Sequence, residues 1–178
     1  MEIIAVLFSL ISVWLTSKDK IWCWPTGIIG VIAFACLFYT KGEWANVGLQ
    51  FIFLFQSISA WINWKNPSVK ITKISKDDFA GLVYVLIILG VFVYSFSLIA
   101  NSTQPLLDSV TTSLSIAGMF LLVHKNIEAW YCWILADILY VILFLKDELY
   151  LSSFIYIVFL VMAIYGYKNW KKQIKHGI

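Results

Sequence analysis

Long apolar segments, each near the length of a membrane-spanning helix, follow one another along almost the whole chain. A helix needs about 20 apolar residues to cross the hydrocarbon core of a bilayer. Of the 178 residues, 61% are hydrophobic and 13% are charged, whereas a soluble domain has about 25% charged residues. We therefore predict an all-α polytopic membrane protein, a single transmembrane domain over residues 1–178, with seven transmembrane helices at 2–17, 21–40, 44–64, 79–99, 106–123, 127–145 and 149–168.

The lysines indicate which helix ends face the cytoplasm. Lysine and arginine are enriched in the short cytoplasmic loops of membrane proteins, and this chain has no arginine. With seven helices, only Lys41 and Lys146 fall at one face. We therefore expect the amino terminus outside and the carboxyl terminus inside the cell, in the plasma (inner) membrane. The other face carries Lys18, Lys20, Lys65, Lys70, Lys73, Lys76, Lys125, Lys168, Lys171, Lys172 and Lys175.

Two stretches of the chain are similar, which indicates an internal duplication. Each begins with paired tryptophans, passes through an apolar helix to a short charged turn (41–43 and 146–148), and closes on Trp-Lys after another helix. The closing pairs, at 64–65 and 170–171, are 106 residues apart.

The duplication predicts two parallel three-helix-bundle repeats in a 3+1+3 arrangement. A single helix between two three-helix units lets both units cross the membrane in the same direction. Transporters built from such repeats bind their substrate near the midplane, between the repeats. Repeat 1 covers about 2–64, the linker helix about 79–99, and repeat 2 about 106–170.

A carboxylate lies near the centre of the sixth predicted helix. Placing an aspartate there is unfavourable by about 2.5–3.5 kcal/mol on insertion scales, so Asp137 is not expected to face lipid. The helical periodicity puts Trp130, Trp133, Asp137 and Tyr140 on one face. The alternatives are an interfacial tryptophan belt and a structural hydrogen bond between helices.

Polar side chains on three other helices complete a candidate cavity. Such stripes also serve close helix packing, which is the alternative for the fifth helix. Gln56 points away from the stripe of its helix, toward residues 79–99 or another subunit. The candidate residues are Gln50, Ser57 and Trp61 in the third helix, Asp108, Thr112 and Ser115 in the fifth, and Tyr156 in the seventh.

These residue types fit a flat organic cation. Aromatic rings attract cations by cation–π interaction, Asp137 would complement the charge, and the amides would orient polar substituents. We find no nucleophile–base pair and no metal-ligand spacing, so we predict a transporter and neither an enzyme nor a cofactor or nucleic-acid binder. A channel or a non-transporting membrane scaffold is the alternative; a channel would more plausibly repeat an acidic ring around an oligomer axis.

The sequence resembles the nicotinamide riboside transporter (PnuC) family over nearly its whole length. The resemblance rests on "WCWPTGIIG", "GLQFIFLFQSISAWINW", "LDSVTTSLSIAGMFL", "NIEAWYCW" and "AIYGYKNW". It implies a SWEET-like fold, a homotrimer, and import by facilitated diffusion, with a cytoplasmic kinase trapping the substrate. It also implies that Trp130 and Trp133 flank the substrate's ring, and that Gln50 and Asp137 make polar contacts.

The resemblance leaves the substrate open among vitamins. Nicotinamide riboside has a cationic ring and a hydroxyl-rich ribose, so it suits the rings, the carboxylate and the amides together. Thiamine, also a flat cation, is the second candidate. Riboflavin is neutral and would leave Asp137 without a charge partner, so it ranks third.

Overall fold

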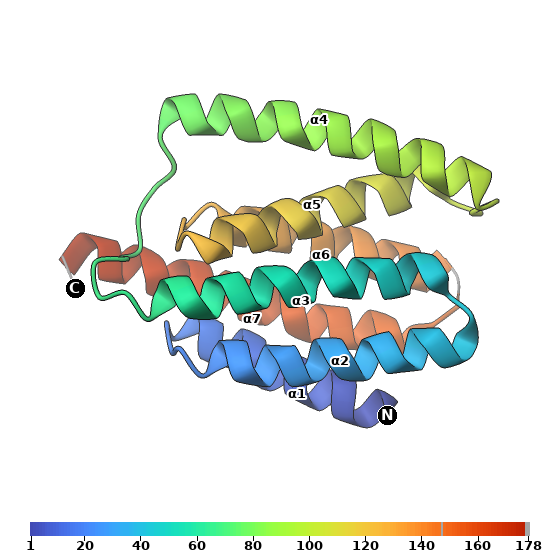
Figure 1. The fold of residues 1–178 in the computed structure, drawn as a ribbon, viewed down its shortest axis with the longest axis horizontal. Helices are drawn as coiled ribbons and strands as arrows, with labels where there is room; N and C mark the ends of the chain where they lie inside the picture. Colours follow the sequence, from blue (N-terminus) through green and yellow to red (C-terminus); the bar gives the residue numbers. More distant parts are fainter. Residues whose placement is uncertain (147, 177–178) are drawn as a thin grey trace.

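The computed structural model describes residues 1–146 and 148–176. Within these residues the chain folds into seven α-helices that run roughly along one direction (Figure 1). Residue 147, in the predicted turn after the sixth helix, and residues 177–178 of the predicted domain lie outside the described residues. The helices are α1 Glu2–Ser17, α2 Cys23–Lys41, α3 Trp44–Trp64, α4 Lys76–Ile99, α5 Pro105–Val123, α6 Ala129–Lys146 and α7 Tyr150–His176.

The predicted helices agree with the observed ones to within three residues, except at the end of α7. That helix continues eight residues beyond the predicted end at residue 168, through its lysine-rich final turns. Hydropathy marks where a helix leaves the bilayer, whereas a helix stops where its backbone is capped. Six of the described helices are long and apolar enough to span a membrane, and α1 is a shorter apolar helix.

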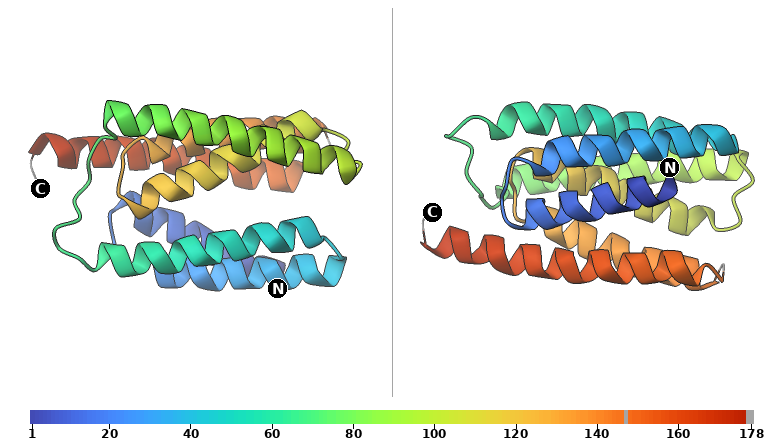
Figure 2. Two further views of the ribbon diagram at one scale, coloured as in Figure 1. Left: turned by 45° about the horizontal axis from the view of Figure 1, so that its top comes forward. Right: turned by 90° about the horizontal axis from the view of Figure 1, so that it is seen from below.

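Consecutive helices pack antiparallel in two groups. α1 packs on α2 and α2 on α3, and likewise α5 packs on α6 and α6 on α7. The groups meet where α7 contacts α1 and where α3 contacts α5. α4 packs within the described chain only against α5, at one side of the molecule (Figures 1 and 2).

The buried apolar core is concentrated at one end of the bundle, where α1, α3, α5 and α7 terminate and the loops carry most of the lysines (Figure 1). We call this the lysine-rich end. Nearer the middle and at the other end, the buried side chains are mostly small or polar. The bundle therefore has a tightly packed apolar end and a more polar interior. The core residues are Cys23, Trp24, Ala60, Trp64, Ile71, Leu121, Leu122, Ile127, Ala129, Trp130, Ala163 and Trp170.

The loop between α3 and α4 is fastened to the lysine-rich end. Thr72 forms an isolated parallel β-bridge with Asn126, in the turn between α5 and α6. The carboxylate of Glu128 accepts a hydrogen bond of 3.0 Å from the backbone N–H of Ile74. Ser75 then caps α4, its hydroxyl accepting from the N–H of Asp78 at 3.1 Å. These contacts hold the long loop against the bundle.

Candidate functional site

A buried carboxylate occupies the middle of α6. Asp137 is 4% exposed, and among the described residues no hydrogen bond to its carboxylate is found. Burying an ionised carboxylate without a partner is strongly unfavourable. A cationic ligand would supply the missing partner, so Asp137 is taken as the centre of the candidate site.

Two tyrosines lie within electrostatic range of this carboxylate. The rings of Tyr140 in α6 and Tyr156 in α7 lie 4.6 Å apart between centroids. Both interact electrostatically with Asp137. The Tyr140 hydroxyl also lies against the side chains of Thr111 and Ser115 in α5. The structure therefore joins three helices around Asp137.

The two tryptophans of the predicted stacking pair contact different neighbours. Trp130 is 2% exposed and meets Trp170 of α7 edge to face, with ring centroids 5.4 Å apart. Trp133 lies against Gly118 of α5. Both indole N–H groups are buried without an acceptor among the described residues. A buried donor without a partner is unfavourable by about 1–3 kcal/mol, so both donors would gain from an acceptor on a ligand.

Gly166 supplies the space that Trp130 fills. A Cβ atom at this position would lie 2.5 Å from the tryptophan ring, and the ring is packed on all sides. We expect Gly166→Ala to lower the free energy of unfolding by about 1–3 kcal/mol through overpacking. Gly48→Ala, where nothing lies within 4 Å, should be neutral or slightly stabilising. Thermal unfolding in detergent compares the two; equal melting temperatures would show that Trp130 is free to move.

The candidate residues of α3 are buried to different degrees. Ser57 is 1% exposed and Gln50 9% exposed, whereas Trp61 is half-buried, with the Lys65 ammonium 4.8 Å from its ring centroid. The prediction that Gln56 reaches the linker helix is wrong. Its side-chain N–H donates to the Ile116 carbonyl of α5 at 3.2 Å, because α3 packs on α5 and not on α4.

In α5, Thr111 lies closer to the candidate site than the predicted Thr112. Thr111 is 1% exposed and lies beside Tyr140, whereas Thr112 is half-buried. Ser115 is buried, and its hydroxyl donates to the Thr111 carbonyl at 2.8 Å. Asp108 lies in the first turn and accepts a hydrogen bond from the Ser102 hydroxyl. Periodicity alone did not separate Thr111 from Thr112, because both border the same polar stripe.

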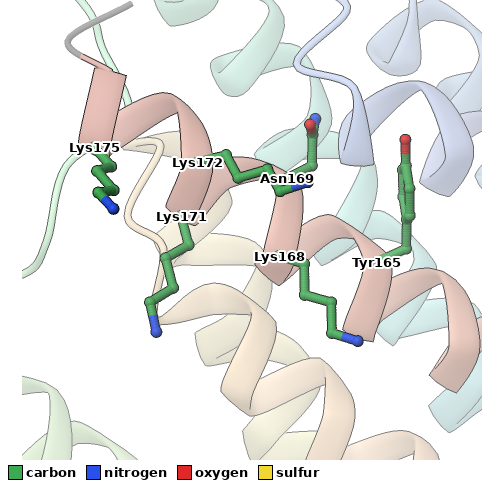
Figure 3. A pocket seen from close by; sticks show the side chains of 6 residues that line it. All are labelled: Tyr165, Lys168, Asn169, Lys171, Lys172 and Lys175. Atoms are coloured by element: carbon green, nitrogen blue, oxygen red, sulfur yellow. The ribbon is translucent and has the colours of Figure 1, made fainter.

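Two grooves on the described residues lie away from this site. One, of about 420 Å³, runs along the last turns of α7 and is lined mainly by lysines (Figure 3). The other, of about 320 Å³, lies between α4 and α5. Asp137 is buried in this conformation, whereas Tyr140 and Tyr156 are half-buried. Among the described residues there is also no cluster of His, Cys, Asp and Glu side chains that could hold a metal ion.

Known proteins share this chain's sequence and fold. The chain is 24% identical to the nicotinamide riboside transporter PnuC of Escherichia coli K12, with 95% of this chain and 84% of that protein covered. It is 21% identical to the riboflavin/roseoflavin transporter RibM of Streptomyces davaonensis, over 95% and 83%. The fold superposes on a crystal structure of the vitamin B3 transporter PnuC with a TM-score of 0.79 and 22% identity, covering 97% of this chain and 81% of that one.

The family model described as nicotinamide mononucleotide transporter matches residues 1–172. That match spans the motifs of α2, α3, α5, α6 and α7 on which the resemblance rested, so it confirms the resemblance. The chain belongs to the nicotinamide mononucleotide transporter family.

Proposed function

We propose that this protein imports nicotinamide riboside across the plasma (inner) membrane by facilitated diffusion. The observation that carries the proposal is the buried carboxylate of Asp137, which has no hydrogen-bond partner among the described residues and lies beside Tyr140 and Tyr156. A cationic pyridinium ring would supply the missing charge partner. The ribose hydroxyls would meet the hydroxyl groups of Thr111, Ser115 and Tyr140.

The relatives' names leave more than one vitamin in view. Relatives are named for nicotinamide riboside and for riboflavin, and the family model for nicotinamide mononucleotide. The mononucleotide adds an anionic phosphate, which would approach a buried carboxylate unfavourably. Riboflavin is neutral, so it would leave Asp137 unpaired. Thiamine is a flat cation and is the second candidate.

The site would hold its ligand with residues of both halves of the chain. Asp137, Tyr140 and Tyr156 all lie on the second half, within electrostatic range of one another. Gln50 and Ser57 are buried on α3 of the first half. Trp130 and Trp133 would flank the ring and donate their free indole N–H groups. Trp61, Thr112 and Asp108 complete the predicted set.

We propose that the helices form two parallel repeats with α4 as the linker. Hydrogen bonds at equivalent positions support this arrangement. Asn63 and Trp64 donate to the Val123 and Leu122 carbonyls of α5, at 2.8 and 2.9 Å. Asn169 and Trp170 donate to the Ser17 and Thr16 carbonyls of α1, at 2.8 and 3.1 Å.

Each donor of the second set lies 106 residues after its counterpart in the first set. Each acceptor of the second set lies 106 residues before its counterpart. Reciprocal contacts of this kind arise when two like units are related by a twofold rotation. The axis would run along the membrane normal, as in transporters with parallel repeats.

The lysine distribution supports a cytoplasmic location for the lysine-rich end. We expect a cysteine introduced at Ser68, exposed in the α3–α4 loop, to be protected in intact cells from an impermeant maleimide. It should react after the cells are opened. The control is Tyr150→Cys, exposed at the opposite end, which should react in intact cells. The reverse pattern would invert the topology.

Two further parts of the proposal concern partners. A cytoplasmic kinase would phosphorylate the imported nucleoside and so trap it, and the chain would assemble as a homotrimer. A channel or a membrane scaffold is the alternative class. The convergence of the polar groups within one chain favours a transporter, since a channel would more plausibly repeat an acidic ring around an oligomer axis.

A ligand panel tests the proposal. We expect nicotinamide riboside to raise the melting temperature of the purified protein and to quench its tryptophan fluorescence, more than thiamine does and far more than riboflavin. Stronger stabilisation by thiamine would transfer the assignment to thiamine. Stabilisation by none of the three would contradict a vitamin transporter.

A further inference from the structure

At the lysine-rich end, two residues of the first half contact the residues that lie 106 positions later, in the second half. Trp64 and Trp170, 106 residues apart, lie with ring centroids 6.0 Å apart. Asp19 and Lys125, also 106 residues apart, form an ion pair of 2.8 Å. Two equivalent positions of a twofold arrangement approach each other only close to the axis. These four side chains therefore lie on the axis, at the end where the core is packed most tightly.

The local backbone at the ion pair is the same in both halves. Asp19 and Lys125 each follow the last turn of a helix and adopt positive φ angles of 54° and 53°. Their N–H groups donate to the Thr16 and Leu122 carbonyls respectively. The two turns thus present equivalent positions face to face. Identical charges there would repel, whereas Asp19 opposite Lys125 attracts.

Aromatic side chains close the space around the ion pair. The Lys125 ammonium lies 4.4 Å from the Trp64 ring centroid. Trp24 meets Trp64 edge to face at 5.0 Å and 88°, and Trp130 meets Trp170 at 5.4 Å and 88°. All four tryptophans are at most 6% exposed. Nothing the size of a nucleoside can pass along the axis while this cluster is closed.

We infer that Asp19, Lys125, Trp64 and Trp170 form the gate through which substrate leaves toward the cytoplasm. The inference rests on the proposed transport function, because it assumes a substrate path between the two repeats. The structure then represents a state closed on the cytoplasmic side. Release requires the ion pair and the Trp64–Trp170 contact to separate.

A labelling experiment tests the gate without any substrate. Cys23, Cys36 and Cys132 are replaced, and a reporter cysteine is placed at Ser57, which is buried two turns before Trp64. The protein is reconstituted in vesicles, and a membrane-impermeant thiol reagent is added on the side of the lysine-rich end. We expect Asp19→Lys or Lys125→Asp to speed labelling at least tenfold, because like charges then face each other on the axis.

The charge-swapped double variant is the decisive member of the set. Asp19→Lys combined with Lys125→Asp should return labelling to the slow rate of the parent. Lys20→Asp, on an exposed neighbour that forms no ion pair among the described residues, should leave labelling slow. If a charge reversal prevents folding, Asp19→Asn removes the attraction while keeping the shape, and should still speed labelling severalfold. Slow labelling in all single variants, or fast labelling in the double variant, would overturn the gate.

Failure of the gate and failure of the transport proposal give different results. Ligand binding is read by thermal shift on the same charge variants with Ser57 and the native cysteines kept, because Ser57 belongs to the candidate site. Unchanged nicotinamide riboside binding with unchanged labelling removes only the gate. Accelerated labelling without binding of any vitamin retains an axial closure but removes the assigned substrate.

A different observation carries a second inference, concerning the groove on α7. It is lined by Tyr165, Lys168, Asn169, Lys171, Lys172 and Lys175, which follow one another along successive turns (Figure 3). The only ion pair among the described residues joins Lys125 to Asp19, so no carboxylate neutralises these lysines. At the end nearer the bundle, Tyr165 stacks on the exposed Trp14 of α1 at 5.4 Å. The groove therefore runs from an aromatic end to a cationic end.

We propose that this groove binds an anionic phospholipid of the leaflet it faces. Tryptophan and tyrosine favour the depth of the headgroup boundary, and lysines just beyond it attract anionic headgroups. A phospholipid matches the two ends of the groove, because its apolar chains would lie at the aromatic end and its phosphate at the lysines. A free phosphate ion would use the lysines but not the Trp14–Tyr165 pair.

Soluble short-chain lipids distinguish a phospholipid from a free phosphate ion as the ligand of the groove. Dihexanoyl phosphatidylglycerol should raise the melting temperature of the purified protein by at least about 3 °C, whereas phosphatidylcholine of the same length and glycerol 3-phosphate should not. Lys172→Gln/Lys175→Gln should abolish the rise, and the matched loop variant Lys70→Gln/Lys73→Gln should keep it. An equal rise with phosphatidylcholine, or with the Lys172/Lys175 variant, would overturn the site. An equal rise with glycerol 3-phosphate would make it a phosphate site.

Discussion

Asp137→Asn is expected to weaken nicotinamide riboside binding by about 30-fold or more, because truncating one partner of a buried charge pair is unfavourable by about 2–5 kcal/mol. The amide keeps the size of the carboxylate and removes its charge. The variant should retain its fold and melt at the same or a higher temperature than the parent, since a buried carboxylate with no partner is itself destabilising. Titration by tryptophan fluorescence measures the affinity, and thermal unfolding without ligand measures the stability.

Asp108→Asn is the matched control. Asp108 also lies on a membrane helix but is half-buried and accepts a hydrogen bond from Ser102, so its charge already has a partner. We expect at most a few-fold loss of affinity there. Riboflavin binding, if measurable, should change little in Asp137→Asn, because riboflavin carries no charge. Equal small losses in both variants would assign Asp137 to helix packing and leave the cation without its recognised partner.

The spans of the seven helices could be predicted because a membrane leaves the backbone few options. Inside lipid every backbone N–H and C=O group must bond within its own helix, so a run of apolar residues near 20 indicates one element. The same reasoning failed at the end of α7. The lysines from residue 168 onward end the apolar run, but these residues remain good helix formers, so the helix continues to His176.

The site could be predicted only in part. Asp137 stands out because an ionisable residue in the middle of an apolar segment is rare. Its neighbours depend on which helices touch, and the sequence does not specify that. Tyr156 lies 19 residues from Asp137 along the chain and is brought close by the packing of α7 on α6. Whether Thr111 or Thr112 faces Tyr140 depends on how α5 is rotated about its axis.

The proposed repeat has more support in the contacts of the structure than in the similarity of the two sequence stretches. The paired tryptophans at the two helix starts align poorly as pairs, because only Trp24 and Trp130 occupy equivalent positions. Their contacts support the proposed equivalence, since Trp24 meets Trp64 and Trp130 meets Trp170 at the same angle of 88°. Asp19 and Lys125 are 106 residues apart but carry opposite charges, so a comparison of the two sequence stretches does not match them.

That equivalence provides the sharpest test of the predicted stacking role. Trp24 and Trp130 are both nearly fully buried, both contact a tryptophan edge to face, and both have an indole N–H without an acceptor among the described residues. Trp24→Phe and Trp130→Phe therefore remove the same groups from matched surroundings. We expect both to lower the free energy of unfolding by a similar amount, about 1–3 kcal/mol, because each leaves a small cavity in the core.

Binding should separate the two variants. If Trp130 flanks the substrate's ring, Trp130→Phe loses part of the stacking surface and the free N–H donor, and its affinity for nicotinamide riboside should fall by about tenfold. Trp24→Phe should bind nearly as tightly as the parent, since Asp137, Tyr140 and Tyr156 all lie in the second repeat with Trp130. Equal losses of affinity in both variants would mean that the tryptophans act through the stability of the lysine-rich end and not through contact with the ligand.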